Sequence, residues 1–226
     1  MVWSEKMFCI NKKDLAYITT KFNDKFLITP DIHTSTSVFW RYDFSDIRRD
    51  DKIIDLGANI GGFAIAASHK VCKYPVMAIE PLRYKYLVNN ININNSFVYP
   101  FHGGIHSKYE TEKFKRLEWR EDKGLIPMYS LSEMIEKNNG CSFLKCDIEG
   151  FEFQIKPIEL EGIRRIEMQI HLDMIKEKWK HPLLKYIYKN YNVYITPNSP
   201  IDRIPIAPHP SKPDLLRPQL HCFRIE

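Results

Sequence analysis

The sequence lacks the features that mark several classes of protein. Its 226 residues contain no run of about 18 consecutive apolar residues, the length that a membrane-spanning helix needs. The segment Met1–Cys9 has no basic stretch, apolar core or small-residue cleavage site, so it does not read as a secretory signal. The 5 cysteines are scattered and form no Cys-x-x-Cys pair, which gives no zinc framework and suits reduced thiols. We therefore expect a cytoplasmic protein with no membrane partner.

The excess of positive charge is too small to indicate a particular binding partner. The formal net charge is +5, and 44% of the residues are hydrophobic, as in a globular protein. Residues 108–120 combine lysines and arginines with aromatic side chains, a texture that can bind nucleic acid. A solvated amphipathic segment explains the same pattern more simply. RNA is therefore kept as a less favoured partner, and the oligomeric state stays open.

From Lys52 onward, strand and helix patterns alternate, which predicts an α/β fold with a mostly parallel sheet. The expected strands are 52–56, 76–80, 97–101, 142–147, 163–170, 191–196 and 220–225. The expected helices are 62–70, 83–93, 130–138 and 174–190. Residues 197–219 hold half of the 14 prolines and cannot form a helix, so the last of the seven strands is expected to be antiparallel. This proline-rich loop is either a substrate lid or a rigid connector.

Residues 1–50 differ in texture from the rest of the chain. Residues 15–20 and 25–29 are rich in β-formers and flank Asn23-Asp24, which predicts a hairpin. We expect 1–50 to form a β-rich N-terminal cap within the same globule, and 51–226 to form the main domain.

A glycine turn follows the first strand of the main domain. Asp55-Leu-Gly-Ala-Asn-Ile-Gly-Gly62 joins a strand to a helix, and the next strand ends in Glu80. Such a unit binds a nucleoside-containing cofactor at the ends of parallel strands. A dinucleotide site needs glycine where Asn59 stands, so S-adenosylmethionine fits better than NAD. We expect Gly57, Asn59 and Gly61 to line the methionine end.

Two acids near this turn have expected roles of their own. Asp55 is expected to fix the turn and face the methionyl ammonium, while Glu80 accepts both ribose hydroxyls in a bidentate contact. The alternative is that the glycines serve only the packing of helix on strand. His102, after the third strand, is a candidate for contact with the adenine, although an ordinary turn there is an equal alternative.

Acids at the end of the fourth strand are the candidates for chemistry. Asp147 is expected to lie on the cofactor side or to orient an acceptor, and Glu149 is the candidate general base; capping of the next segment is the alternative. Glu167 and His171, on the fifth strand, are expected to face the same side and to form a cluster with Asp147. His171 is then a second candidate base. A weak divalent-metal site is the alternative, but a lone strand-end histidine is more often structural, so no metal is expected.

Together these motifs resemble the FkbM-type methyltransferase family. The resemblance rests on Asp55-Leu-Gly-Ala-Asn-Ile-Gly61, Ala78-Ile-Glu80-Pro81, Leu87-x-x-Asn90-x-x-x-Asn94 and Leu144-Lys-Cys-Asp147-Ile-Glu149-Gly150-Phe-Glu152. It covers about residues 38–170. It implies a class I Rossmann-like methyltransferase that uses S-adenosylmethionine, mostly on hydroxyl oxygens, and here on a small molecule or glycan. The alternatives are an RNA methyltransferase and a non-catalytic Rossmann-like binding module.

Overall fold

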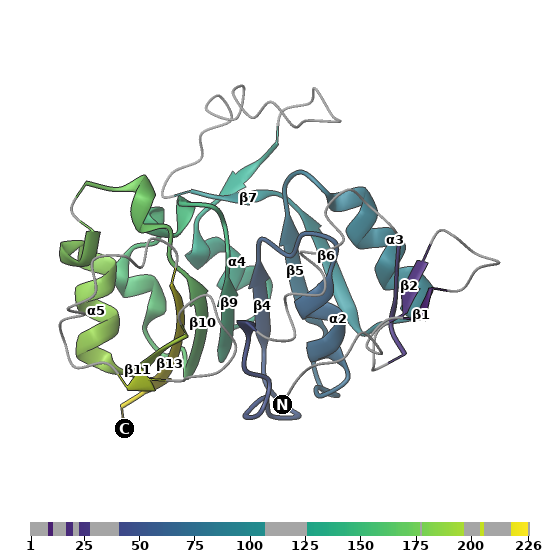
Figure 1. Cartoon of the computed structure of the whole chain (residues 1–226), viewed down its shortest axis with the longest axis horizontal. Coiled ribbons are helices and arrows are strands. Elements are labelled where there is room, and N and C mark those ends of the chain that lie inside the picture. Colours follow the sequence, from purple (N-terminus) through teal and green to yellow (C-terminus); the bar gives the residue numbers. More distant parts are fainter. Residues whose placement is uncertain are drawn as a thin grey trace.

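The computed structural model describes residues 9–10, 17–19, 23–27, 41–106, 126–176, 178–196, 204–205 and 218–225. An eight-stranded sheet runs across the molecule (Figure 1). Its strands in spatial order are β12 (Ile204–Pro205), β11 (Tyr191–Thr196), β13 (Gln219–Arg224), β10 (Arg165–Gln169), β9 (Phe143–Cys146), β4 (Ile53–Leu56), β5 (Val76–Glu80) and β6 (Val98–His102).

The strand directions confirm the predicted topology. The neighbours from β10 to β6 pair in parallel, whereas β13 pairs antiparallel with both β10 and β11. The seven predicted strands are all present in the sheet. The eighth, β12, adds two residues at the edge next to β11 and includes Pro205, a residue that an edge strand tolerates.

Helices cover both faces of the sheet, because its strands are apolar on both sides. Helices α2 (Gly62–Ser68) and α3 (Tyr84–Asn94) pack on the face that carries Ile53 and Ala78. Helices α4 (Leu131–Lys137) and α5 (Pro182–Asn190) pack on the face that carries Ile54 and Leu56. The result is a three-layer α/β architecture with one apolar cluster on each side.

The helix predicted over 174–190 is shorter than expected. It begins at Pro182, with His181 as its N-cap, because proline fits the first helical turn and not the interior. The residues before it form the 3₁₀ turns η5 (Leu172–Met174) and η6 (Lys178–Lys180). The connection from β9 to β10 likewise consists of 3₁₀ turns, η3 (Phe151–Gln154) and η4 (Pro157–Leu160).

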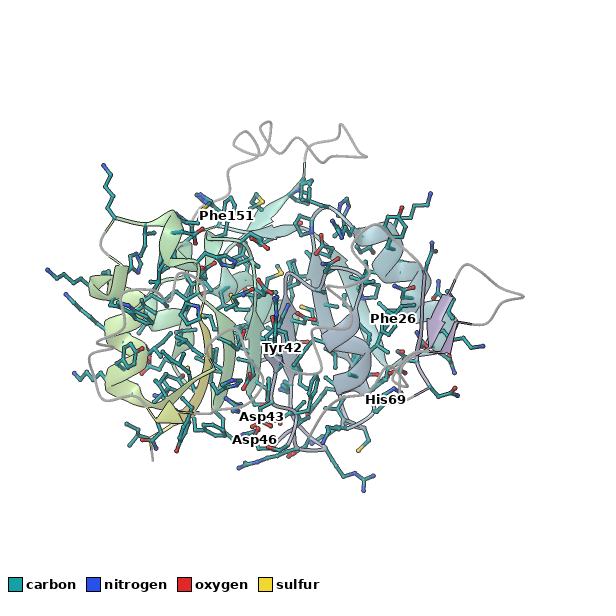
Figure 2. The ribbon with its side chains drawn as sticks, viewed as in Figure 1. Phe26, Tyr42, Asp43, Asp46, His69 and Phe151 are labelled. Carbon is teal, nitrogen blue, oxygen red and sulfur yellow. The ribbon has the colours of Figure 1, made fainter. Side chains whose placement is uncertain are left out.

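Two smaller sheets complete the described part of the chain. Strands β7 (Gly104–Ile105) and β8 (Met128–Tyr129) pair in parallel. Strands β1 (Cys9–Ile10), β2 (Tyr17–Thr19) and β3 (Lys25–Leu27) form an antiparallel sheet beside α3, and β2–β3 is the predicted hairpin (Figure 1). Phe26 is buried in the α2–α3 cluster, so the hairpin packs on the main domain (Figure 2).

The segment 41–51 lies against the middle of the sheet and is held there by charge. Arg164 donates to Asp46 and Asp51 at 2.7 and 2.8 Å, and Arg165 donates to Asp46 at 3.1 Å. Tyr42 lies over the centre of the sheet, with Asp43 and Asp46 toward one end (Figure 2). The division at residue 50 remains a prediction, and most of the proline-rich segment 197–219 lies outside the described residues. Within the described ranges, no helix has the length and apolar character that crossing a membrane requires.

Candidate functional site

Strand register brings the predicted site residues to the carboxyl edge of the sheet. Leu56 pairs with Ile79 on one side and with Cys146 on the other, so the segments that follow β4, β5 and β9 emerge together. Glu80 pairs with His102 of β6. Ligands of doubly wound sheets bind at this edge.

The glycine turn is shaped by close approach to β9. Gly57 has φ +72°, and a Cβ at this position would lie 1.9 Å from the carbonyl oxygen of Asp147. Asn59 and Gly61 also have positive φ, at 54° and 96°. The N–H groups of Gly57 and Ala58 both donate to the carbonyl oxygen of Ile79 at 3.0 Å. Gly57 therefore brings the turn close to two neighbouring strands. Gly61 is buried and its N–H donates to the carbonyl oxygen of Ala58 at 2.9 Å, so the partly exposed Asn59 remains the candidate cofactor contact.

Glu80 ties the glycine turn to the start of α3. Its Oε2 accepts from the N–H of Asn59 at 2.8 Å, while Oε1 accepts from the N–H groups of Leu82 and Arg83 at 2.8 and 2.9 Å. A carboxylate offers about four acceptor positions, so roughly one remains on Glu80. That suits a single ribose hydroxyl, whereas the sequence predicted a bidentate contact with two.

Asp55 is buried beside a lysine that the sequence analysis assigned no role. Its Oδ1 lies 2.9 Å from Nζ of Lys145, and Nζ also donates to the carbonyl oxygen of Gly57 at 2.8 Å. Burial raises the pKa of Asp55, and the ammonium of Lys145 opposes that rise. Oδ2 of Asp55 has no hydrogen-bond partner among the described residues. An unpartnered carboxylate oxygen at the end of β4 suits a ligand ammonium group, as predicted for the methionyl end.

Asp147, Glu149 and His171 come together as a carboxylate–imidazole group. Nε2 of His171 lies 3.3 Å from Oε2 of Glu149 and 4.0 Å from Oδ1 of Asp147. Asp147 accepts from the hydroxyl of Tyr42 at 2.9 Å. The amide nitrogen of Gln169, in its hydrogen-bonded orientation, donates to both Asp147 oxygens at 3.0 and 3.1 Å. The side chain of Glu149 is 74% exposed and is the most accessible member of the group.

A third carboxylate, that of Glu152, contacts the other ring nitrogen of His171, Nδ1. Oε1 of Glu152 lies 3.0 Å from Nδ1 of His171 and accepts from its backbone N–H at 2.6 Å. Burial alone would lower the pKa of His171, but hydrogen bonds to Glu149 and Glu152 raise it to about 10. The ring is then an imidazolium at neutral pH, a state that does not suit a general base.

Glu167 does not join this group, contrary to expectation. It is fully buried and pairs with Arg165 and with Nδ1 of His221, at 2.7 Å for the latter. The backbone N–H of Asp43 donates to it at 3.2 Å. Buried charges need partners, and this network supplies them away from Asp147.

His102 lies where the sequence placed it, at the carboxyl end of β6. Its ring stacks on Tyr84 with centroids 4.7 Å apart and an interplanar angle of 17°. Nε2 lies 3.1 Å from the carbonyl oxygen of Pro81. His102 is exposed and Tyr84 is half-buried, and His102 pairs with Glu80 across the two strands. The basic stretch 108–120 lies outside the described residues.

Sequence reasoning missed four residues that support the site: Tyr42, Lys145, Glu152 and Gln169. Tyr42 is 105 positions away from Asp147, so nothing local links them. Gln169 does carry a signal, since it ends β10 two residues before His171. Burial raises the pKa of Tyr42 well above its usual value, and Asp147 adds to the rise, so its hydroxyl remains a donor.

The fold and the site define a class I methyltransferase-like architecture with a cofactor edge and a carboxylate–imidazole group. The methyltransferase FkbM domain model matches residues 55–187, which is more than half of the chain, and the chain belongs to this family. It is an S-adenosylmethionine-dependent methyltransferase.

Solved structures are similar at the level of the fold. A Methanococcus jannaschii fibrillarin pre-rRNA processing protein matches with a TM-score of 0.53 and 13% identity, covering 96% of this chain and 93% of that one. An Aeropyrum pernix fibrillarin with natively bound S-adenosyl-L-methionine gives a TM-score of 0.49 and 10% identity, with coverage of 91% and 92%. Only the first score exceeds 0.5, and at this identity it speaks for the fold alone. A search of curated proteins found no match.

Proposed function

We propose that the protein transfers a methyl group from S-adenosylmethionine to a hydroxyl oxygen of a small molecule or glycan. One observation carries the proposal. The acid suited to a ribose hydroxyl, Glu80, and the group of Asp147, Glu149 and His171 lie along the same edge of one sheet. Donor and acceptor can therefore meet between β5 and β10.

The residues at this edge fit the cofactor. Oδ2 of Asp55 is buried without a hydrogen-bond partner among the described residues and suits the methionyl ammonium. Glu80 accepts from the N–H of Asn59 in the glycine turn, and its remaining acceptor position suits a ribose hydroxyl. The exposed ring of His102, stacked on Tyr84, supports its proposed contact with the adenine. When bound, S-adenosylmethionine supplies an electrophilic methyl group on a sulfonium.

The carboxylate–imidazole group is placed for the acceptor. Asp147, held by Tyr42 and Gln169, would orient the acceptor hydroxyl so that its oxygen is aligned with the methyl carbon. The oxygen–carbon bond forms as the carbon–sulfur bond breaks, and Glu149 is the candidate to take up the hydroxyl proton. The negative charge of the group also favours a cationic donor nearby.

Cofactor binding tests the first half of the proposal. Glu80→Gln keeps the shape of the side chain but removes its charge. We expect S-adenosylmethionine binding to weaken about 10-fold or more, as for the loss of a hydrogen bond to a charged group. Calorimetric titration measures this, with Glu161→Gln as the control because Glu161 is exposed and precedes β10 at the opposite edge. No binding by the unmodified protein would refute the proposal.

Transfer of a labelled methyl group identifies the chemical class of the acceptor. The protein is incubated with methyl-labelled cofactor and separate pools of small metabolites, glycans and RNA. Label on a hydroxyl of the first or second pool is the expected result, with the turnover rate reduced about 100-fold in Glu149→Gln. Label confined to RNA would overturn the acceptor class while leaving the donor assignment intact.

A further inference from the structure

Three potential cation ligands meet at one point of the structure. Asp147, Glu149 and His171 each offer one ligand atom, and these atoms lie within 4.8 Å of one another. From Nε2 of His171 the carboxylate oxygens of Glu149 and Asp147 are 3.3 and 4.0 Å away. Ligands about 2.1 Å from a Mg²⁺ ion stand ~3.0 Å apart at adjacent corners of an octahedron and ~4.2 Å apart at opposite corners. Both observed separations fall between these values.

The histidine is oriented as a ligand. Its side chain is 1% exposed, and its Nδ1 is 3.0 Å from a carboxylate oxygen of Glu152, which is itself fully buried. Metal-bound histidines almost always donate the other ring N–H to a carboxylate or carbonyl, which fixes the ring. Nε2 points toward the two remaining carboxylates and makes no hydrogen bond of good geometry within the described part of the chain. A buried and fixed ring nitrogen that faces two carboxylates without a well-formed hydrogen bond suits a shared cation.

The two carboxylates differ in how they are held. Asp147 is fixed by Tyr42 and Gln169, which leave it capacity to accept more. Glu149 extends into solvent from a backbone with φ +52°, a conformation that non-glycine residues rarely adopt. Two ligands are thus set in the protein and the third closes the group from the solvent side.

We propose that Asp147, Glu149 and His171 bind one divalent cation of the Mg²⁺ or Mn²⁺ type at the carboxyl ends of β9 and β10. Carboxylates and water are the usual partners of these ions, and one imidazole is compatible with Mn²⁺. Three side chains leave coordination positions for water or for an oxygen of the methyl acceptor. The sequence alone favoured no metal, because a lone histidine at a strand end is more often structural.

A cation at this site would bind and activate the methyl acceptor. This part of the inference rests on the proposed function. A hydroxyl bound to a divalent cation loses its proton more readily and is held in place. Glu149 would then be a ligand, and the hydroxyl proton would pass to a water molecule at the cation and from there to solvent. The acceptor would accordingly be a compound whose oxygen atoms bind hard cations. An imidazole ligand must give up its Nε2 proton, so binding is expected to release protons.

Mn²⁺ binding to the full chain tests the proposal directly. Electron paramagnetic resonance reports free Mn²⁺, whose signal falls as the ion binds. We expect one ion per chain, displaced by excess Mg²⁺, with affinity at least about 10-fold weaker in Glu149→Gln. This side chain is largely exposed, so the variant should fold. Glu161→Gln is the matched control and should bind as the unmodified protein does. Absence of binding at millimolar Mn²⁺, or equal binding by Glu149→Gln, would overturn the cation site.

A second variant and a second titration distinguish failure of the cation site from failure of the proposed function. Glu152→Gln leaves all three ligands in place but removes the charge behind His171, and we expect about 10–100-fold weaker Mn²⁺ binding. Calorimetry with S-adenosylmethionine is run on the same samples without metal. Cofactor binding without Mn²⁺ binding refutes the cation site and spares the proposed function. Mn²⁺ binding without cofactor binding refutes the proposed function and spares the site.

Discussion

The absence of a side chain at Gly57 allows the glycine turn to pack closely against the end of β9. A Cβ on Gly57 would lie 1.9 Å from the carbonyl oxygen of Asp147, the residue that we propose orients the methyl acceptor. Gly57 therefore sets the distance between the cofactor turn and the catalytic candidates. It does so by lacking a side chain, so its contribution is steric.

Gly57→Ala is expected to destabilise the protein severely. The 1.9 Å approach to a backbone atom must be relieved by moving β4 or β9, and the positive φ adds strain, for a combined loss of about 3 kcal/mol or more. Urea unfolding followed by circular dichroism measures the loss. Gly162→Ala is the control, because Gly162 has φ +80° with no atom within 4 Å of a Cβ. It should cost only the strain, about 1 kcal/mol; equal losses in the two variants would contradict the steric explanation.

At this scale the sequence predicted positions better than contacts. Asp55, Glu80 and Asp147 lie at strand ends because strand boundaries can be read from the sequence. The contacts of Tyr42 with Asp147 and of Glu152 with His171 could not be foreseen, since each depends on the fold; Glu152 stood in a motif of the resemblance without a role of its own.

The N-terminal hairpin and α3 are joined by one side chain. Asn94, in the last turn of α3, accepts from the backbone N–H of Lys25 and donates to its carbonyl oxygen, both at 2.7 Å. The side-chain amide of Asn94 thereby makes the same pair of hydrogen bonds to Lys25 that the backbone of an adjacent strand would make. Phe26 then fills the α2–α3 cluster next to this contact.

Asn94→Ala should loosen the hairpin more than the rest of the protein. Two hydrogen bonds to Lys25 are lost, and we expect the free energy of unfolding to fall by about 1–2 kcal/mol. Hydrogen exchange at the Lys25 amide should accelerate, while amides of β4 stay protected. Asn92→Ala is a matched change, since Asn92 is an exposed asparagine on the same helix. Unchanged exchange at Lys25 in Asn94→Ala would count against the link.

At the scale of helices and strands, the hydrophobic periodicity of the sequence predicted the elements correctly where capping and turn residues marked the same boundaries. The strands of the main sheet and helices α2, α3 and α4 lie within a few residues of their expected positions. The expected helix over 174–190 was wrong in its first half because apolar spacing continued across Pro182, which opens a helix and does not sit inside one. The segment 41–51 had no periodic pattern, since ion pairs with Arg164 and Arg165 hold it.

On the scale of the whole molecule, Tyr191 joins segments that are distant in sequence. Its hydroxyl is within 3.0 Å of the carbonyl oxygen of Leu160 and 2.9 Å of that of Ile163, and Arg224 of β13 approaches it at 3.4 Å. Burial raises the pKa of Tyr191 to about 12, and the nearby Arg224 opposes the rise. The neutral hydroxyl is therefore part of what holds β11 and β13 to the β9–β10 connection.

This pKa gives stability a dependence on alkaline pH. An unfolded tyrosine ionises near pH ~10. The contribution of Tyr191 is fully present below that value and is lost as the pH rises through about 12. We expect Tyr191→Phe to be less stable at pH 8, by about 1–2 kcal/mol, and to lose stability less steeply between pH ~10 and ~12. Chemical unfolding across this range measures both, with Tyr99→Phe as an exposed control that keeps the original slope.

The position of β13 has a consequence for the order of folding. This strand follows every other strand of the sheet along the chain, yet it inserts between β10 and β11. During synthesis β10 and β11 are both made before the strand that separates them, so each presents an unpaired edge to the nascent chain and its surroundings. The half of the sheet from β10 to β6, which carries the glycine turn and Asp147, can assemble earlier. The joining of the two halves has to wait for the last strand to emerge.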